Sequence, residues 1–477
     1  MSAILNDVPI ACKRDRIEPI IRGDYPDPTI VRVGGDYYLT HSANWFAPAL
    51  LIWHSTDLKE WRPLTHALAD YGGDIWAPDI SHYEGRFYIY FTTSGRNKVI
   101  TADNIMGPWS DPIDLNVPHI DPGHLATPDG RRFLYLSGGH IVELAADGLS
   151  TIGELRKIYD GWAIPFPTRI EALAEEGPKP FYRGGWYYLV TAQGGTAGPA
   201  TGHMVVVARS RTHDGPWENA PANPILRTGS RNERWWCQGH GTIFETALGE
   251  WRIVYHAYEQ GFVSLGRHTL IQEIVWTDDG WPQLGETEPS ASISTYPSLS
   301  DDFTGAELSW QWQFSRELDR SRYTVGDGEL TLEGRGASPA SGSPPLCIRP
   351  QDEAYEVEVD VEIYDDDTQA GLIFYYDETA LTGLAVTGSR VIMLLRKHDE
   401  TAIDAPARQA TLRLVNDHHD VDYWVRIAGE EWQQIPRGNE ISGWNHNALG
   451  GFLGLRAALY VSGTGKGTFR NFRYRSL

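Results

Sequence analysis

The stretch GGDYYLTHS at residues 34–42 decides the fold, because similar stretches follow it at four more places in the chain. In each of the five, a turn containing Gly or Asp leads into a strand rich in aromatic residues. The later four are EGRFYIYFTTS (84–94), DGRRFLYLSGG (129–139), RGGWYYLVTAQGG (183–195) and LGEWRIVYHA (248–257). Their spacing of roughly 50 residues is typical of propeller blades with four strands each. The sequence therefore predicts five blades.

A second repeated feature is a turn followed by a Trp, and it lies between the aromatic strands. Trp61, Trp109 and Trp217 occupy this place in DLKEWRP, IMGPWSD and HDGPWEN. An outer strand needs bulk to fill the wedge between neighbouring blades. We therefore expect these three side chains to pack between blades.

The pattern changes in the last two fifths of the chain. The segment ETEPSASISTYPSLS (286–300) is rich in Pro and Ser, which is typical of a linker. The strands that follow are longer and alternate between apolar and polar residues, as in YEVEVDVEIYD (355–365). We therefore expect an all-β chain: a five-bladed β-propeller over residues 1–295, followed by an antiparallel β-sandwich (jelly-roll) over residues 296–477.

Composition and charge limit the classes of function. The chain has 477 residues, 18 Trp, 23 Tyr and a formal net charge of −22. Nucleic acid and anionic membranes bind clusters of Lys and Arg, so this charge argues against both. Aromatic rings with a polar edge suit sugars among other neutral partners. No apolar run is long enough to span a membrane.

The N-terminus and the cysteines bear on location. The start, MSAILNDVPIACKRDRIEP, carries charges by Asp7 and lacks the apolar region of a signal peptide. Cys12, Cys237 and Cys347 are isolated, odd in number and without metal-ligand spacing. We therefore expect reduced thiols in a cytoplasmic protein. The sequence leaves the oligomeric state open, and a homo-oligomer is one alternative.

One polar residue lies 8 to 12 positions before each aromatic strand: Asp27, Asp79, Asp121, Glu176 and His240. The innermost strand of each blade lines the propeller axis, so these residues are expected to meet at one end of it. Any single Asp beside a Pro is usually a turn residue. Several carboxylates brought together repel one another and raise the pKa of at least one, which chemistry with both an acid and a base requires.

The same stretches carry a resemblance to a known family. YPDPTIVRVGGDYYL, WAPDI, IDPGHLATPDGRRFLYL, EGPKPFYRGGWYYLVTAQGGT, GHGTIFETALGEWRIVYHA and GRHTLIQEIVWTDDGWP resemble, in order, the motifs of glycoside hydrolase family 43. Residues from DDFTGAELSWQWQF (301–314) to GGFLGLRAALYVSGTG (450–465) look like the concanavalin-like β-sandwich of its β-xylosidase-type members. The resemblance implies a five-bladed propeller and an inverting mechanism.

Three catalytic roles are implied by matching these motifs. Asp27 is expected to be the general base that activates water, and Glu176 the general acid that protonates the leaving oxygen. Asp121 is expected to orient this acid and to keep its pKa high. Glu175 is the neighbour of Glu176, but adjacent residues of a strand point to opposite faces, so only one faces the axis. The motif EGP selects Glu176.

The resemblance also suggests residues that bind the sugar or an ion. Trp76 looks like a wall against which the sugar stacks, with a core Trp as the alternative. Arg267 resembles an arginine that contacts the sugar or the acid, with a surface ion pair as the alternative. His240 is either a buried, satisfied histidine or a residue beneath the sugar that helps to hold a hydrated calcium ion. No cofactor is expected for the chemistry itself.

The remaining candidates concern the shape and selectivity of the pocket. Trp45 and Phe46, in ANWFAP, are candidates to shape it. Asp79 stands where many β-xylosidase-like relatives carry His, whereas Asp is common in arabinan- and arabinoside-acting relatives. The sandwich is expected to be either a carbohydrate-binding module or a brace, and Phe452 in GGFLG is the candidate to close the pocket from that side.

These expectations leave three hypotheses of function. The first is an exo-acting inverting β-D-xylosidase that releases xylose from small β-1,4-xylo-oligosaccharides. The second is an α-L-arabinofuranosidase, or an enzyme with both activities, because the two pentoses present similar hydroxyl geometry. The third is a non-catalytic sugar-binding propeller, in which at least one of Asp27, Asp121 and Glu176 would be replaced; all three are present.

Overall fold

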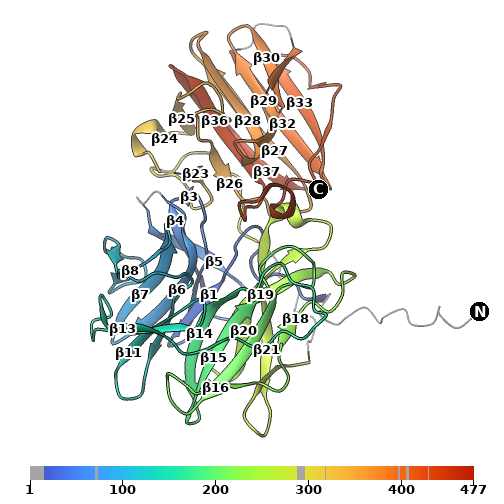
Figure 1. Cartoon of the computed structure of the whole chain (residues 1–477). Coiled ribbons are helices and arrows are strands. Elements are labelled where there is room, and N and C mark those ends of the chain that lie inside the picture. Colours follow the sequence, from blue (N-terminus) through green and yellow to red (C-terminus); the bar gives the residue numbers. More distant parts are fainter. Residues whose placement is uncertain are drawn as a thin grey trace, which may run out of the picture.

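The computed structural model describes residues 16–69, 73–286, 296–316, 318–395, 398–403, 408–427 and 429–477. It confirms the predicted all-β fold: five small antiparallel sheets surround an axis, and two larger sheets form a second body above them (Figure 1). Most of the expected linker and Cys12 lie outside the described residues. Cys237 and Cys347 are buried free thiols. No helix within the described ranges is long and apolar enough to cross a membrane.

The five blades follow one another along the chain, each with its strands in sequence order. Blade 1 contains β1 (Thr29–Val33), β2 (Asp36–Thr40), β4 (Ala49–Ser55) and β5 (Arg62–Leu68). Blade 2 contains β6 (Trp76–Tyr83), β7 (Arg86–Thr93), β8 (Arg96–Ala102) and β9 (Ile113–Asp114). Blade 3 contains β10 (Gly123–Ala126), β11 (Arg132–Leu136), β12 (His140–Leu144) and β13 (Thr151–Lys157).

The last two blades carry small additions. Blade 4 contains β14 (Glu175–Arg183), β15 (Trp186–Gln193), β16 (Met204–Ser210) and β17 (Glu218–Asn219), with β18 (Leu226–Arg227) also paired to β16. Blade 5 contains β19 (Trp235–Glu245), β20 (Trp251–Glu259), β21 (Arg267–Trp276) and β22 (Pro282–Leu284), with the 3₁₀ helix η2 (Val263–Leu265) between β20 and β21.

The aromatic strands lie inside the blades and are covered on both faces. In RFYIYFTT (β7), every residue after Arg86 is buried, which is typical of a strand packed on both sides. The repeated Trp residues belong to the apolar clusters between blades. Trp61 packs with residues of blades 1 and 5, Trp109 with blades 1 and 2, and Trp217 with blades 3 and 4. The predicted packing role of these three side chains is confirmed.

The N-terminal segment closes the ring of blades. Ile21 forms a β-bridge with Thr269 in β21, and the backbone N–H of Tyr25 donates to the carbonyl oxygen of Arg267 (2.9 Å). The chain then turns into β1, the inner strand of blade 1. This closure brings Asp27, at the start of blade 1, next to Arg267, which begins the third strand of blade 5.

The second body is a sandwich of two antiparallel sheets. One sheet is ordered β3 (Phe46–Ala47), β23 (Gln313–Ser315), β26 (Leu346–Ile348), β36 (Arg456–Gly463), β28 (Thr368–Asp377), β29 (Ala380–Thr387), β30 (Arg390–Leu395) and β31 (His398–Ile403). The other is ordered β24 (Tyr323–Gly326), β25 (Glu329–Glu333), β37 (Lys466–Ser476), β27 (Ala354–Ile363), β32 (Gln409–Asp417), β33 (Asp420–Ile427) and β34 (Gln433–Gln434), with β35 (Asn439–Glu440) paired to β33. The described part of the sandwich also contains two short helices, η3 (Arg320–Arg322) and α1 (His446–Leu449).

The two bodies share secondary structure. The short strand β3 leaves blade 1 and pairs with β23, so that the sandwich sheet ends on a propeller segment. A buried ion pair adds to this junction, because Nη2 of Arg456 donates to Oδ2 of Asp24 at 2.9 Å. The same Asp24 oxygen accepts the backbone N–H of Gly454 (3.0 Å). These contacts fix the loop before β36 against the end of the propeller axis.

Candidate active site

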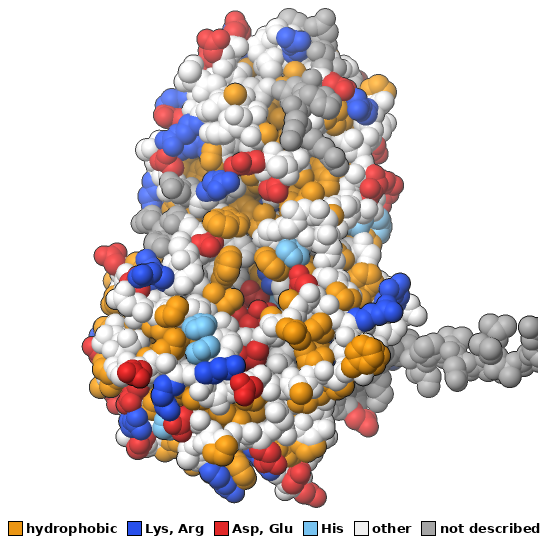
Figure 2. Space-filling view, in the orientation of Figure 1, with side chains coloured by type: hydrophobic (Ala, Val, Ile, Leu, Met, Phe, Trp, Pro, Cys, Tyr) orange, Lys and Arg blue, Asp and Glu red, His pale blue; other side chains and the backbone are white. Residues whose placement is uncertain are grey.

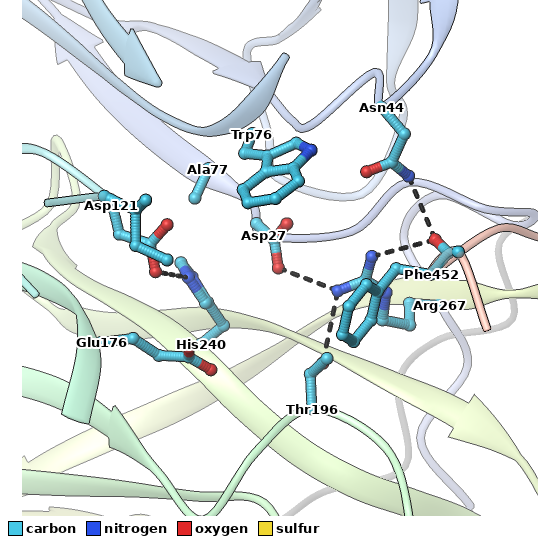
Figure 3. A pocket seen from close by; sticks show the side chains of 12 residues that line it. Asp27, Asn44, Trp76, Ala77, Asp121, Glu176, Thr196, His240, Arg267 and Phe452 are labelled. Carbon is cyan, nitrogen blue, oxygen red and sulfur yellow. Dashed lines mark hydrogen bonds and ion pairs between the residues drawn. The ribbon is translucent and has the colours of Figure 1, made fainter. Parts of the chain in front are cut away.

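A pocket lies at the end of the propeller axis that faces the sandwich. Figure 2 shows acidic side chains in a hollow between the two bodies, and Figure 3 shows the pocket from close by. Residues from blades 1 to 5 and from the sandwich line it: Asp27, Asn44, Trp76, Ala77, Ile120, Asp121, Glu176, Thr196, His240, Arg267, Gly451 and Phe452. Four of the five polar residues expected to converge therefore do so.

A residue with left-handed backbone recurs at or near the start of the inner strand in blades 1 to 4, and midway along the inner strand β19 in blade 5. The φ angles are +58° at Asp27, +23° at Ala77, +58° at Asp121, +57° at Gly177 and +54° at His240. In blades 2, 4 and 5 the pairing register of the inner strand also shifts at this point. A bulge of this kind re-aims a side chain, and non-glycine residues adopt such angles only where the surroundings enforce them. In blades 1, 3 and 5 the left-handed residue is itself a polar group that lines the pocket, and in blade 4 it directly follows the lining Glu176.

Asp27 is held by partners on both oxygens. The Ser42 hydroxyl donates to Oδ2 (2.5 Å), and Nη1 of Arg267 donates to Oδ1 (3.1 Å). Ser42 is fixed in turn, because its oxygen accepts the backbone N–H of Ala77 (2.6 Å). Burial alone would raise the pKa of Asp27, but the Arg267 guanidinium, followed by His240, holds it well below its usual range. Asp27 is therefore ionised at neutral pH.

Glu176 has the opposite electrostatic environment. Burial, followed by the nearby carboxylate of Asp121, raises the pKa of Glu176 to about 8. Asp121 is itself fixed, because its Oδ2 accepts the backbone N–H of Gly177 (3.1 Å) and lies 3.4 Å from Nε2 of His240. Glu175, on the other face of β14, is not among the lining residues. Glu176 is therefore mostly protonated at neutral pH.

One pocket thus holds an ionised carboxylate and a protonated carboxylic acid. Two carboxyl groups whose surroundings push their pKa values apart can act together as a general base and a general acid. The electrostatics follow from the fold, since Asp27 lies beside the Arg267 cation whereas Glu176 lies beside the Asp121 anion. This arrangement can protonate a leaving oxygen while it activates a water molecule.

The sandwich supplies one wall of the pocket through Gly451 and Phe452. The carbonyl oxygen of Phe452 accepts hydrogen bonds from Nδ2 of Asn44 (3.1 Å) and from Nη2 of Arg267 (3.4 Å) (Figure 3). Arg267 therefore contacts both Asp27 and this wall. Trp76 lines the pocket in the same view, as expected for a ring on which a sugar stacks.

Three expected pocket residues lie elsewhere. Asp79 is buried beside the axis, where its carboxylate binds Nζ of Lys179 (2.9 Å), the Thr29 hydroxyl (3.2 Å) and the backbone N–H of His124 (2.8 Å). It does not line the pocket; in blade 2 the left-handed residue, Ala77, and its neighbour Trp76 do.

Neither member of the Trp45–Phe46 pair lines the pocket. The Phe46 side chain is 1 % exposed and belongs to the apolar core of the sandwich, with the Arg456 guanidinium 4.5 Å from its ring centroid. Trp45 is 40 % exposed, and its carbonyl oxygen accepts the backbone N–H of Arg316. Both residues serve the domain junction instead, because strand β3 draws this segment into the sandwich sheet.

The surroundings of His240, which was expected to help to hold a hydrated calcium ion, do not favour direct coordination of a metal by its imidazole. Carboxylates at Asp27 and Asp121 raise the pKa of His240, although burial alone would lower it. An imidazole that favours its protonated form is a poor metal ligand, and Ca²⁺ prefers six to eight oxygen ligands. Across the described part of the chain, no group of three or more His, Cys, Asp or Glu side chains could hold a metal ion.

Three further residues matter for the site but were not found from the sequence. Ser42 follows the second strand of blade 1, Thr196 lies in the loop after β15, and Asn44 precedes β3. None of them occupies a position that repeats from blade to blade. Only Thr196 could have been found from the sequence, because it lies in the Gly-rich stretch QGGTAG. A loop of this composition can bring its backbone close to a ligand.

The propeller, its paired carboxyl groups and its aromatic wall define a glycoside hydrolase, and comparison with known proteins gives the family. The model of glycosyl hydrolases family 43 matches residues 17–282, and the model of the β-xylosidase C-terminal concanavalin A-like domain matches residues 300–475. The chain therefore belongs to glycoside hydrolase family 43, and the predicted resemblance is confirmed.

Relatives match along nearly the whole chain. It is 30% identical to the xylosidase/arabinosidase 43B of Humicola insolens, over 96% of this chain and 97% of the relative. It is 27% identical to the non-reducing end α-L-arabinofuranosidase of Bacteroides ovatus, over 94% and 91% of the two chains. The crystal structure of a xylan β-1,4-xylosidase from Bacillus halodurans matches with a TM-score of 0.85 at 28% identity, covering 96% of this chain and 100% of that one.

Proposed function

We propose that this chain is an exo-acting, inverting β-D-xylosidase that releases xylose from the non-reducing end of small β-1,4-xylo-oligosaccharides. The observation that carries the proposal is the pair of carboxyl groups with opposite protonation, Asp27 and Glu176, in a pocket walled on one side by Phe452. Relatives named xylosidases, including the structurally similar protein from Bacillus halodurans, support the choice of sugar.

The proposed reaction uses these groups in a single displacement. Asp27 takes a proton from a water molecule as the water oxygen bonds to the anomeric carbon. Glu176 gives its proton to the glycosidic oxygen as the bond from that oxygen to the anomeric carbon breaks. Attack from the face opposite the leaving group inverts the anomeric configuration, which requires acid and base to flank the bond with room for water between them.

Asp121 and Arg267 are proposed to prepare the two reacting carboxyl groups. Asp121 keeps a negative charge near Glu176, which favours the protonated form of the acid. Arg267 favours the ionised form of Asp27 and directs its Oδ1 by a hydrogen bond. The wall built by Phe452 is proposed to favour attack on chain ends, because it limits the room for a sugar chain that continues past the pocket on that side.

The second candidate is an α-L-arabinofuranosidase, alone or combined with xylosidase activity. The names of the Bacteroides ovatus and Humicola insolens relatives favour it. The Asp at position 79 has less weight in this choice than the sequence suggested, because its carboxylate binds Lys179 outside the pocket. A third alternative, a non-catalytic sugar-binding propeller, is disfavoured because Asp27, Asp121 and Glu176 all line the pocket.

Hydrolysis of nitrophenyl β-D-xylopyranoside and nitrophenyl α-L-arabinofuranoside tests the proposal. We expect both to be cleaved, with the higher kcat/KM on the xyloside. A ratio of xyloside to arabinofuranoside far below one would favour the second candidate. Absence of cleavage of either substrate would favour the non-catalytic propeller.

Three finer parts of the proposal have separate tests. If a hydrated calcium ion binds near His240 through water, treatment with a chelator should lower the Tm of the protein. An unchanged Tm would argue against the ion. A cytoplasmic location predicts activity in the soluble fraction of source cells and none outside them. A homo-oligomer predicts a mass in solution that is a multiple of the 53.4 kDa chain.

A further inference from the structure

His256 connects the proposed base to Thr196, a second residue that lines the pocket. His256 lies on β20, the second strand of blade 5, and its side chain is fully buried. Its Nδ1 accepts the backbone N–H of Asp27 (3.0 Å), and its Nε2 lies 2.9 Å from Oγ1 of Thr196. Burial lowers the pKa of His256 to about 4, so the ring is neutral. Because Nδ1 accepts, Nε2 carries the hydrogen and donates to Thr196.

Thr196 receives a second donor. Nη1 of Arg267, which also binds Asp27, lies 3.3 Å from Oγ1 of Thr196. A hydroxyl oxygen has two lone pairs and one hydrogen, so these two donors occupy its accepting capacity. Thr196 lines the pocket, and its own hydrogen is left to point toward whatever the pocket holds.

We propose that His256 is a positioning residue that fixes Asp27 and Thr196 through its two ring nitrogens and makes Thr196 an obligate donor to an oxygen atom of the bound sugar. This inference rests on the proposed function, because it takes Asp27 as the base. The neutral imidazole of His256 thereby fixes the position of Asp27. It also determines that the Thr196 hydroxyl donates a hydrogen bond to the substrate and does not accept one. His256 itself does not line the pocket.

The surroundings of the ring keep it in this orientation. His203 lies beside it with ring centroids 5.2 Å apart, and His240 stacks with it at 5.8 Å. The charged groups around it are Asp27, Arg267 and His240, whose imidazole the nearby carboxylates favour in its protonated form. Rotation of the imidazole would break both the bond from Asp27 and the bond to Thr196, so its packed neighbours help to preserve the tautomer.

His268 offers a matched control on the neighbouring strand. It is as fully buried as His256, and its Nδ1 accepts the backbone N–H of Gly23 at the same distance of 3.0 Å. The two histidines thus hold the segment from Gly23 to Asp27 in the same way. They differ in two respects: Nδ1 of His256 also lies 3.2 Å from Oδ1 of Asp27, and Nε2 of His268 has no hydrogen-bond partner among the described residues.

Replacement by Asn separates the two nitrogens of the ring. The side-chain oxygen of Asn can take the place of Nδ1, so His256→Asn and His268→Asn each keep an acceptor for the backbone N–H. Only His256→Asn loses the bond to Thr196. We expect kcat/KM to fall about 10- to 100-fold in His256→Asn, the range for loss of a buried hydrogen bond in a binding site, and to stay within about 2-fold in His268→Asn.

A double-mutant cycle with Thr196→Val tests whether His256 acts through the hydroxyl. If it does, His256→Asn should cost little more once the hydroxyl is gone, so the double variant should be about as active as Thr196→Val alone. Losses that simply multiply, or equal activity of His256→Asn and His268→Asn, would overturn the inference. Thermal unfolding of all four variants separates loss of folding from loss of function.

The inference and the proposed function can fail separately. The same double-mutant cycle can be measured without hydrolysis, from the Kd of D-xylose for the unaltered protein, His256→Asn, Thr196→Val and the double variant. Tryptophan fluorescence follows the binding. If the unaltered protein cleaves neither pentoside, the proposed function fails, and the binding cycle still decides the role of His256. If the unaltered protein is active and the cycle shows no coupling, only the inference fails.

Discussion

Blades 1 and 2 place an Asp in similar sequence surroundings, Pro-Asp-Pro at Asp27 and Ala-Pro-Asp at Asp79, but use it differently. Both carboxylates are buried and both bind a cation. In blade 1 the Asp itself has the left-handed backbone and faces the pocket, whereas in blade 2 Ala77 has it and Asp79 turns inward to Lys179. The comparison teaches that the position of the left-handed residue, more than the residue type, separates these two carboxylates, one at the pocket and one in the structure.

The largest effect on activity is expected from replacement of Asp27, the carboxylate that lines the pocket. Asp27→Ala should lower kcat/KM about 10³- to 10⁴-fold, because the water then lacks a base, and should also lower the stability, because the buried Arg267 loses its ion-pair partner. Kinetics on the nitrophenyl pentoside that the unaltered protein prefers, together with circular dichroism, measure this. A variant that retained more than a tenth of the activity would remove Asp27 from the proposed mechanism.

Asp79→Ala should act on stability and not on the chemical step, because Asp79 does not line the pocket. It leaves the Lys179 ammonium buried with two carbonyl oxygens and no counter-ion, so the free energy of unfolding should fall by about 3–5 kcal/mol. Urea unfolding measures this change. The control is Asp79→Ala combined with Lys179→Met, which should recover part of the loss. A fully stable single variant would mean that this pair does not brace the axis.

The pH profile tests the electrostatic difference between Asp27 and Glu176. Glu176 acts in its protonated form, so kcat/KM should be sustained below its pKa of about 8 and decline as the pH rises through that value. Asp121→Asn removes the neighbouring charge that raises this pKa, so the alkaline decline should begin at lower pH. An unmoved alkaline limb would show that Asp121 does not tune the acid.

The smallest effect is expected at the wall from the sandwich. Phe452 contributes its ring to the pocket, but its carbonyl oxygen makes the bonds to Asn44 and Arg267. Phe452→Ala keeps that backbone contact, so KM should rise roughly 3- to 10-fold with a smaller change in kcat. A large fall in kcat with KM unchanged would instead place the ring in the chemical step.

Repetition explains what the sequence predicted and what it did not. The five aromatic strands and the residues that precede them recur at blade spacing, which led to the propeller and to Asp27, Asp121, Glu176 and His240 at the pocket. Ser42, Thr196 and His256 have no counterparts in other blades, so no periodic signal marked them.

The errors in the predicted pocket have local causes. Asp79 was expected there because its offset from the aromatic strand is similar, but offsets do not reveal which residue carries the bulge. Phe46 looked like a pocket residue, yet strand β3 draws it into the sandwich core. A pairing between segments nearly 270 residues apart has no signature in either segment alone.

The most direct test of the account is the configuration of the first product. Proton NMR during early hydrolysis of a β-xyloside by the unaltered protein distinguishes the two anomers of xylose before they interconvert. A water activated by Asp27 and a leaving group protonated by Glu176 predict that α-xylose appears first. Initial release of β-xylose would contradict direct attack by water and, with it, the roles given to the two carboxyl groups.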